Sequence, residues 1–312
     1  MHCDEIQEDA VCDCGCPVVP DAAGVDVEPR SPGAEHLYDT GDASVYLWSE
    51  GRQPGGVYAR GMAAAFSVVD APAVSLASTG DSAVAAAATA AEHDVDLSVY
   101  LPERAPYHAK ALVNVHGGDL RVVRGGYTDA VDAAKAGDSL LTPESAPARI
   151  HGGRSLARDI AASEVDVDAV VLPRGETDVA AGVAYELDVP LHVVEPTGSK
   201  SLARAVDAGE TLDVDVDTVI GYSAVDRLPA PTTEYLLRAH AEDDVVLHAV
   251  DDGDALDECI EVARSTGALA SPAGGLALRV ARSLSGDVLA VDPVSAVGRA
   301  DVLRNRLVYH GE

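Results

Sequence analysis

Two short segments of the sequence combine hydroxyl, carboxylate and glycine residues directly ahead of a helical pattern. Ser78-Thr79-Gly80-Asp81-Ser82 precedes an alanine-rich stretch, and Gly175-Glu176-Thr177-Asp178 precedes the apolar stretch 179–187. The N-terminus of a helix presents unpaired backbone N–H groups and a partial positive charge. Each segment is therefore a candidate binding site for an anionic or polar group.

The two segments fall within a regular alternation of strands and helices. Apolar runs predict strands at 44–48, 73–76, 97–101, 120–123, 169–172, 191–194 and 288–291. Helical patterns lie at 60–69, 82–92, 105–115, 127–136, 155–162, 179–187, 202–208, 233–239, 254–265 and 272–284. This alternation predicts an α/β fold with parallel sheets and right-handed crossovers. The stretch 140–153 interrupts it with prolines and glycines, and predicts a return between two domains.

A longer series of phrases resembles one enzyme family. The phrase Val57-Tyr58-Ala59-Arg60-Gly61-Met62, a strand and then Ser78-Thr79-Gly80-Asp81-Ser82 resemble the threonine synthase branch of the fold-type-II pyridoxal-phosphate (PLP) enzymes. The resemblance implies a tryptophan synthase β-like fold of two domains with parallel sheets. The large domain would comprise residues 21–60 and 150–312, and the inserted small domain residues 61–149.

The resemblance also assigns roles, and the sequence departs from several of them. Tyr58 stands where the family has the lysine that forms a Schiff base with PLP, and tyrosine cannot form an imine. Asp81 stands where the family has an asparagine that contacts the ring oxygen of the cofactor. It could instead cap the following helix. The flanking residues match the loop that receives a substrate carboxylate; they are Ser78, Thr79, Gly80 and Ser82.

The second segment matches the phosphate loop of the family. Family members place several glycines there, so that backbone N–H groups can close on phosphate. Here Gly175 is followed by two carboxylates, those of Glu176 and Asp178, and Thr177 or Asp178 could serve as a helix cap instead. The last strand ends near Asp292-Pro293, and the sequence does not place Ser295 relative to the pyridine nitrogen.

Other candidate groups favour structural interpretations. Lysine occurs at three positions, Lys110, Lys135 and Lys200, and each is expected to be a solvated surface charge. The resemblance places a cleft where residues 78–82 face residues 175–178. Three histidines are expected near this cleft in structural or surface roles; they are His108, His116 and His151. Cys259 lies in an apolar helical pattern and is expected in the core.

Four cysteines near the start of the chain could hold a metal. Cys3, Cys12, Cys14 and Cys16 fall within residues 1–20, and zinc takes four thiolate or imidazole ligands. The arrangement resembles the zinc ribbon of threonine synthase relatives. However, three thiols at alternate positions suit one metal poorly. A small zinc knuckle and an eroded, flexible terminus both remain open.

The amino-acid composition indicates the cellular environment of the protein and excludes some classes of partner. The chain of 312 residues carries 52 acidic against 22 basic side chains, a net charge of −30. Such a surface suits a cytoplasm at molar salt, where screening is short-ranged. With no basic patch and no apolar run of membrane-spanning length, we expect neither a nucleic-acid partner nor a membrane span, and the residues at the start of the given sequence are not expected to act as a signal peptide. The odd number of cysteines, five, predicts reduced thiols in the cytoplasm.

Two functions follow from these features. The first is a catalytically degenerate relative of threonine synthase that acts as a binding or regulatory protein. It would take an amino-acid-like ligand, and would form a homodimer or pair with a related active enzyme. PLP would not be covalently bound. The alternative is an active PLP-dependent lyase or synthase of amino-acid metabolism.

Overall fold

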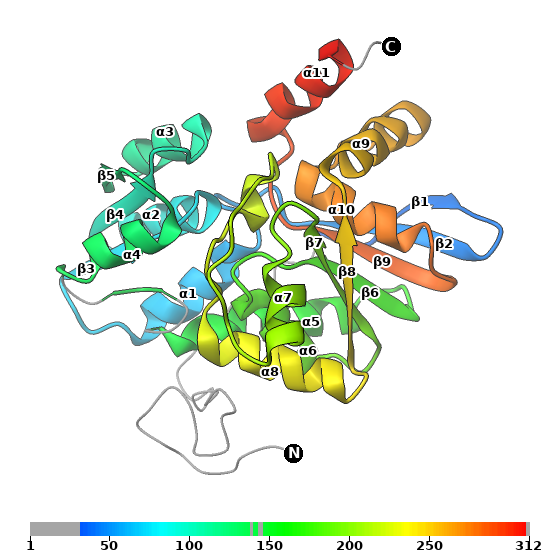
Figure 1. Cartoon of the computed structure of the whole chain (residues 1–312), viewed down its shortest axis with the longest axis horizontal. Helices are drawn as coiled ribbons and strands as arrows, with labels where there is room; N and C mark the ends of the chain where they lie inside the picture. Colours follow the sequence, from blue (N-terminus) through cyan, green and yellow to red (C-terminus); the bar gives the residue numbers. More distant parts are fainter. Residues whose placement is uncertain (1–31, 138–139, 143–145, 310–312) are drawn as a thin grey trace.

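The computed structural model describes residues 32–137, 140–142 and 146–309, and these form two sheets with helices around them (Figure 1). The larger sheet has the strand order β1-β2-β9-β6-β7-β8. Its strands are β1 (Glu35–Asp39), β2 (Ala43–Ser49), β6 (Ala169–Pro173), β7 (Leu191–Pro196), β8 (Val245–Val250) and β9 (Gly286–Asp292). Strands β2, β9, β6, β7 and β8 are parallel, so their carboxyl ends meet at one edge. Ligands bind at this edge in open α/β sheets.

The smaller sheet is built from residues between β2 and β6, and lies to the left in Figure 1. Its parallel strands are β3 (Ala73–Ala77), β4 (Asp96–Pro102) and β5 (Asp119–Val123). Three helices accompany them: α2 (Asp81–His93), α3 (Tyr107–Val115) and α4 (Tyr127–Ala134). This sheet lies within the range predicted for the inserted domain, whose boundaries at 61 and 149 stay a prediction.

The α/β architecture is as expected, but the larger sheet is mixed rather than wholly parallel. Strand β1 pairs antiparallel with β2. The reason is the connection, because the backbone N–H of Thr40 donates to the carbonyl of Ala43 at 2.7 Å in a tight turn. Parallel neighbours need a crossover of a dozen or more residues, which this turn does not supply. The sequence patterns missed β1, the edge strand β8 and the last helix, α11 (Ala300–Tyr309).

Helices cover the larger sheet and begin close to the predicted positions. They are α1 (Tyr58–Val68), α5 (Ile150–Ala161), α6 (Asp178–Glu186), α7 (Ser201–Ala208), α8 (Ala230–Ala241), α9 (Asp252–Thr266) and α10 (Pro272–Ala281). Three short 3-10 turns supplement them: η1 (Pro147–Arg149), η2 (Gly221–Ser223) and η3 (Val297–Arg299). At α10, the Ser271 hydroxyl accepts from the N–H of Gly274 at 3.1 Å, and Pro272 opens the helix.

Helix α5 begins earlier than the sequence predicts. Gly152 and Gly153, which suggested a break, lie inside its first turn. A side chain at Gly152 would collide with the backbone of Gly61 in α1, and one at Gly153 with the carbonyl of Val179 in α6. These glycines therefore permit close packing of three helices. The early start of α5 puts Arg149 directly at its N-terminus, from where its side chain reaches Asp178 in the loop after β6.

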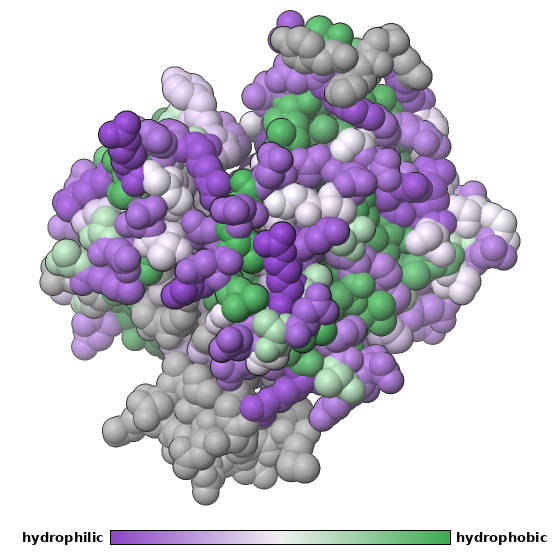
Figure 2. Space-filling model, in the orientation of Figure 1, coloured by the Kyte–Doolittle hydropathy of each residue, from purple (hydrophilic) through white to green (hydrophobic). Residues whose placement is uncertain are grey.

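Buried aliphatic side chains from both sheets form one contiguous core. Strand β6 is buried at all five positions, as expected for a strand covered on both faces. On the face shown in Figure 2, hydrophilic side chains dominate the surface. None of the helices in the described part of the chain is both long and apolar enough to cross a membrane.

Candidate functional site

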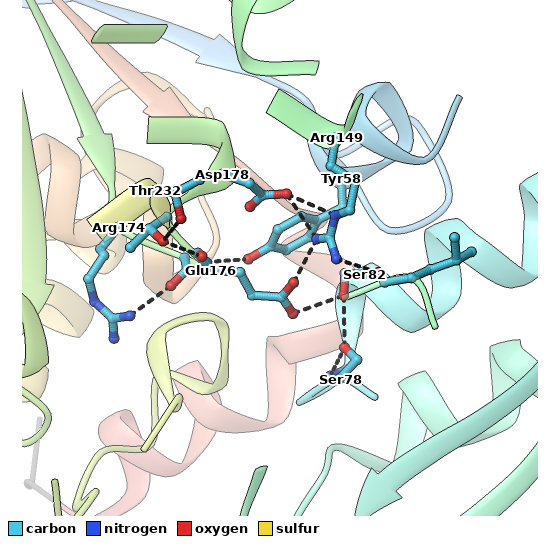
Figure 3. A network of polar contacts seen from close by, with 12 residues as sticks. Tyr58, Ser78, Ser82, Arg149, Arg174, Glu176, Asp178 and Thr232 are labelled. Carbon is cyan, nitrogen blue, oxygen red and sulfur yellow. Dashed lines mark hydrogen bonds and ion pairs between the residues drawn. The ribbon is translucent and has the colours of Figure 1, made fainter. Parts of the chain in front are cut away.

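The two candidate loops lie side by side in the structure, as the order of the family phrases predicted. The Ser82 hydroxyl donates to Oε1 of Glu176 at 2.9 Å, which joins the start of α2 to the β6–α6 loop. Ser82 also hydrogen-bonds Ser78 at 3.0 Å, and the backbone N–H of Gly80 donates to Ser78 at 3.0 Å. Figure 3 shows these groups converging with Tyr58 and Arg149. The loops thus form one buried polar site between the two sheets.

Tyr58, the first residue of α1, occupies the middle of this site. Its residue surface is 3% exposed, and its hydroxyl accepts the backbone N–H of Glu176 at 3.1 Å. Its ring centre lies 5.3 Å from that of Tyr222. Burial, Tyr222 and the nearby carboxylates raise the pKa of Tyr58 well above its usual value. The phenol therefore stays neutral, and it takes a loop N–H group that an anion would otherwise use.

Arg149 pairs with both carboxylates of the acidic loop. Its Nη2 lies 2.7 Å from Oε2 of Glu176 and 2.9 Å from Oδ2 of Asp178, and its Nε donates to the same Asp178 oxygen at 3.0 Å. The third nitrogen, Nη1, donates to the carbonyl of Leu141 at 2.9 Å. Burial alone would lower the pKa of Arg149, but Asp178 and Glu176 raise it. All three guanidinium nitrogens are therefore hydrogen-bonded within the protein.

The cluster holds two carboxylates for one guanidinium. Burial and the neighbouring Asp178 raise the pKa of Glu176, even though Arg149 and Ser82 favour its charged form. The Oδ1 atom of Asp178 is buried and accepts no hydrogen bond from the residues that the structure describes. Like charges this close oppose each other's ionisation. The site is consequently acidic and already crowded.

The expected helix caps in this loop are wrong. Thr177 sits at the N-cap position of α6 with a φ of 74° and makes no side-chain cap. Its hydroxyl donates to the carbonyl of Glu176 at 2.6 Å and contacts the Thr232 hydroxyl at 2.7 Å. Asp178 pairs with Arg149 instead of capping. Beneath the loop, Arg174 donates to the carbonyl of Gly175 at 2.8 Å, and its Nε lies 3.0 Å from Glu195.

Asp81 does not cap α2 either. It forms a close ion pair with Arg299, and His108 Nε2 lies 3.8 Å from its Oδ1. Although burial opposes ionisation, Arg299 and His108 hold the pKa of Asp81 below its usual value. Asp81 is thus a charged carboxylate with a dedicated cationic partner. The sequence patterns gave no sign of Arg299, which lies beyond the last predicted strand.

The end of β9 carries another buried carboxylate. Asp292 accepts the backbone N–H of Ser271 at 3.1 Å, and also the Ser271 hydroxyl at 2.5 Å. Burial raises the pKa of Asp292 to about 6, although Ser271 and Arg299 favour its charged form. Ser295 lies further on, against the segment that carries Gly51.

The residues present do not fit PLP bound as the family resemblance implies. A Schiff base needs an amine, and Tyr58 supplies a buried phenol. A phosphate dianion needs free N–H groups and positive charge, yet Tyr58 takes the Glu176 N–H and two carboxylates stand in the loop. At Gly175, an added Cβ would lie 2.7 Å from the Tyr58 hydroxyl, so little space remains there. These residues therefore support no reaction step through PLP.

The other candidates lie away from this cluster or serve structural contacts. Lys110 donates to the carbonyl of Glu103 at 2.6 Å, Lys135 pairs with Asp132 at 2.8 Å, and Lys200 is exposed. Cys259 is fully buried and its thiol donates to the carbonyl of Ser271 at 3.2 Å, so its prediction as a core residue is confirmed.

The two remaining predicted histidines lie in the described part of the chain, whereas the four predicted zinc ligands do not. His151 is buried in α5, and His116 follows α3, half-buried. The predicted zinc ligands fall outside the described residues; they are Cys3, Cys12, Cys14 and Cys16. In the part of the chain that is described, no group of three or more His, Cys, Asp or Glu side chains could hold a metal ion.

Comparison with known proteins places the chain among relatives. Residues 30–293 match the family model described as "Pyridoxal-phosphate dependent enzyme". An L-threonine dehydratase of Mycobacterium bovis is 31% identical over 205 residues, which cover 61% of this chain and 47% of the relative. A counterpart in Mycobacterium leprae is 30% identical over 227 residues, covering 66% of this chain and 52% of the relative. The chain thus spans about half the length of the curated relatives it matches.

Solved structures agree on the fold. Threonine deaminase isoform 2 of Solanum lycopersicum superposes with a TM-score of 0.74 at 18% identity, covering 92% of this chain and 90% of that one. Maize serine racemase gives a TM-score of 0.72 at 18% identity, covering 86% and 88%. The fold-type-II prediction is confirmed. The narrower resemblance to threonine synthase finds no support, since these relatives are named as dehydratases, deaminases and a racemase.

Proposed function

Because the chain belongs to the family of pyridoxal-phosphate-dependent enzymes, we propose that it keeps the family fold without Schiff-base chemistry and acts as a binding or regulatory protein. One observation carries the proposal. Tyr58, at the position that the resemblance assigns to the lysine, hydrogen-bonds the N–H of Glu176 in the loop assigned to phosphate. Tyr58 therefore takes the place of the Schiff-base lysine, and its hydroxyl also occupies an N–H group of the loop that the resemblance assigns to phosphate.

The Arg149 cluster, formed by Arg149, Glu176 and Asp178, supports this proposal independently. Glu176 and Asp178 are 2% exposed and share one guanidinium. Opening this cluster to admit a phosphate would expose or unpair buried charges, which is strongly unfavourable. The cluster also joins the two sheets through Ser82, so it holds them in one arrangement.

The first test detects directly whether PLP is covalently bound to a lysine. Purified protein is mixed with PLP in molar KCl, its visible absorbance is recorded, and borohydride is added before peptide mass spectrometry. We expect no aldimine band and no reduced adduct at Lys110, Lys135 or Lys200. A stoichiometric adduct at one lysine would instead establish an active PLP enzyme. The curated relatives would then make a hydroxyamino acid such as threonine the first substrate to try.

A second test asks whether the loop, and not only the missing amine, prevents PLP binding. Tyr58→Lys alone is expected to gain no tight cofactor, because like charges about 4 Å apart repel by about 4 kcal/mol at an effective dielectric of about 20. Combining it with Glu176→Gly and Asp178→Gly removes both carboxylates and frees Arg149 to pair with phosphate. Only the combined variant should become borohydride-trappable. Equal binding by the single variant would show that residues 175–178 do not form the phosphate loop.

The proposed role also concerns partners. A protein of this fold that catalyses no reaction can still bind a second copy of itself or a related active enzyme. An amino-acid-like molecule remains the expected small ligand. Sedimentation velocity at several protein concentrations tests self-association. A monomer at every concentration would leave pairing with a related enzyme as the remaining form of the partner prediction.

A further inference from the structure

A second polar site opens on a cavity that the Arg149 cluster does not reach. The cavity, of about 280 Å³, lies between α2 and α3 on one side and the segments that follow β2 and β9 on the other. Its walls include Asp81, Val84, His108, Leu112, Val297 and Arg299. It therefore lies where the smaller sheet with its helices meets the larger one. In Figure 2 the visible surface is hollowed between these two parts.

Arg299 brings unused hydrogen-bond donors to this cavity. The residue is only 6% exposed, yet Asp81 is the one acceptor that its guanidinium has among the described residues. A guanidinium carries five N–H donors in a planar fork. Its remaining donors are therefore available to a molecule that fills the cavity.

His108 brings a second unused polar atom. Its Nε2 is buried and has no hydrogen-bond partner within the described chain, although Asp81 Oδ1 lies 3.8 Å away. Gly298 packs against the same ring, since an added Cβ there would lie 3.1 Å from Cδ2 of His108. A buried polar atom without a partner is uncommon in folded proteins and calls for an explanation.

Two of the other buried arginines have a pairing that Arg299 lacks, whereas Arg174 pairs with Glu195 and also donates to a backbone carbonyl. Arg149 pairs with Glu176 and Asp178, and Arg60 pairs with Glu50 at 2.9 Å and Asp159 at 2.7 Å. Each of these guanidiniums thus serves two carboxylates. Arg299 hydrogen-bonds one carboxylate, that of Asp81; Asp292 acts on it only electrostatically, and the cavity lies beside it.

We propose that this cavity binds a small organic carboxylate with a short apolar body, whose carboxylate group accepts hydrogen bonds from the donors of Arg299 that Asp81 leaves unused. The planar fork of arginine suits a carboxylate, and His108 supplies a further polar contact. Apolar side chains complete the walls: Leu112 is 39% exposed and Val297 is 76% exposed at the rim. A cation does not suit the cavity, because it would face the N–H donors of Arg299. A nucleotide does not suit it either, because the cavity volume is small for one.

The proposal does not depend on the loss of PLP chemistry. Arg299, His108 and Leu112 take no part in the contacts of Tyr58 and Arg149. The borohydride experiment detects PLP attached to a lysine, and its result does not depend on what binds in this cavity. Either proposal can therefore fail while the other stands.

The test uses three defined probes, namely acetate, isobutyrate and isocaproate, titrated calorimetrically into the full chain at constant KCl. Isobutyramide is the neutral control of matched shape. We expect one saturable site for at least one of the carboxylates, with isobutyrate or isocaproate tighter than acetate. Isobutyramide should bind about tenfold more weakly than isobutyrate, because it loses a charge-assisted hydrogen bond.

Two variants locate the binding. Leu112→Trp fills the cavity from an exposed helix position and leaves every ion pair intact, and it should weaken carboxylate binding about tenfold or more. Arg299→Gln with Asp81→Asn removes the ion pair as a unit and should abolish binding. Arg227→Gln, which removes an exposed pair with Asp213, is the matched control and should change affinity by less than about twofold.

Each result bears on the proposal. No saturable binding by any of the three carboxylates would overturn it. Binding that the amide matches, or that Leu112→Trp leaves unchanged, would also overturn it. If the double variant does not fold, the Leu112→Trp titration still decides, because its site is exposed and carries no charge.

Discussion

Arg149 and Arg299 are both buried arginines at the junction of the two sheets, yet their surroundings differ. Arg149 binds two carboxylates and a backbone carbonyl, so no guanidinium nitrogen lacks a partner. Arg299 has one carboxylate partner in the described chain, and a cavity lies beside it. A buried arginine with every nitrogen paired is structural. One with unused donors beside a cavity is arranged for a molecule that the chain does not supply.

The difference should be largest when each arginine is removed. Arg149→Met leaves Glu176 and Asp178 buried without a counter-charge, and should lower the free energy of unfolding by about 3–5 kcal/mol. Arg299→Met should cost less, because water in the cavity can hydrate Asp81. Urea unfolding in molar KCl measures both. Equal losses would mean that the cavity gives Asp81 no access to water.

Salt dependence provides the control for that experiment. The net charge of −30 predicts that wild-type stability rises with KCl, since screening reduces repulsion between surface carboxylates. The loss caused by Arg149→Met should persist in molar KCl, because buried pairs are screened weakly. Arg227→Met breaks an exposed pair and should cost less than about 1 kcal/mol at any salt concentration.

A combined variant separates charge from packing at the Arg149 cluster. Arg149→Met with Glu176→Gln and Asp178→Asn removes all three charges together. This variant should recover at least about 2 kcal/mol of the Arg149→Met loss, because replacing a buried ionic group as a unit is far less costly than breaking it. If the combined variant is as unstable as Arg149→Met alone, the cluster acts through shape and hydrogen bonds more than through charge.

Asp292 extends the comparison to pH, because it is a second carboxylate near Arg299 with a pKa raised by burial to about 6. A raised carboxyl pKa stabilises the fold fully below the unfolded pKa, near 4, and this stabilisation is lost as pH rises to about 6. Asp292→Asn lacks this slope. Relative to wild type, the variant should therefore gain up to about 3 kcal/mol between pH 4 and pH 7, at about 1.4 kcal/mol per pKa unit. A constant difference across this range would show that Asp292 does not titrate as a buried acid.

The sequence predicted much of the frame of these sites. The order of the family phrases and the break at 140–153 implied that residues 78–82 and 175–178 would face each other, and Ser82 does contact Glu176. Tyr58 lies two residues ahead of the helix predicted at 60–69, and in the structure it is the first residue of α1. The two loops follow strands of different sheets, so their meeting follows from the family resemblance and not from the geometry of one sheet.

The partners of the carboxylates could not be predicted in the same way. Gly152 and Gly153 read as a break, so Arg149 seemed to lie in a connection between domains, although both glycines serve helix packing. Arg299 follows the last strand by seven residues and reaches Asp81 across 218 positions of the chain. One signal was available: two acidic residues in a buried loop require a counter-charge, but the sequence does not say which arginine supplies it.

The smallest expected effect concerns Tyr58 and tests whether its hydroxyl completes the filled site. Tyr58→Phe keeps the ring against Tyr222 but leaves the N–H of Glu176 without its acceptor. A buried N–H that loses its partner costs about 1–3 kcal/mol, and we expect the lower end because the aromatic contacts remain. Tyr222→Phe is the matched control, since the Tyr222 hydroxyl accepts no backbone N–H in the described chain, and it should change stability by less than about 0.5 kcal/mol. Amide hydrogen exchange at Glu176 reads the same contact locally and should accelerate in Tyr58→Phe alone. Unchanged exchange there would show that the loop N–H is held by its own backbone, and that Tyr58 fills the site by volume only.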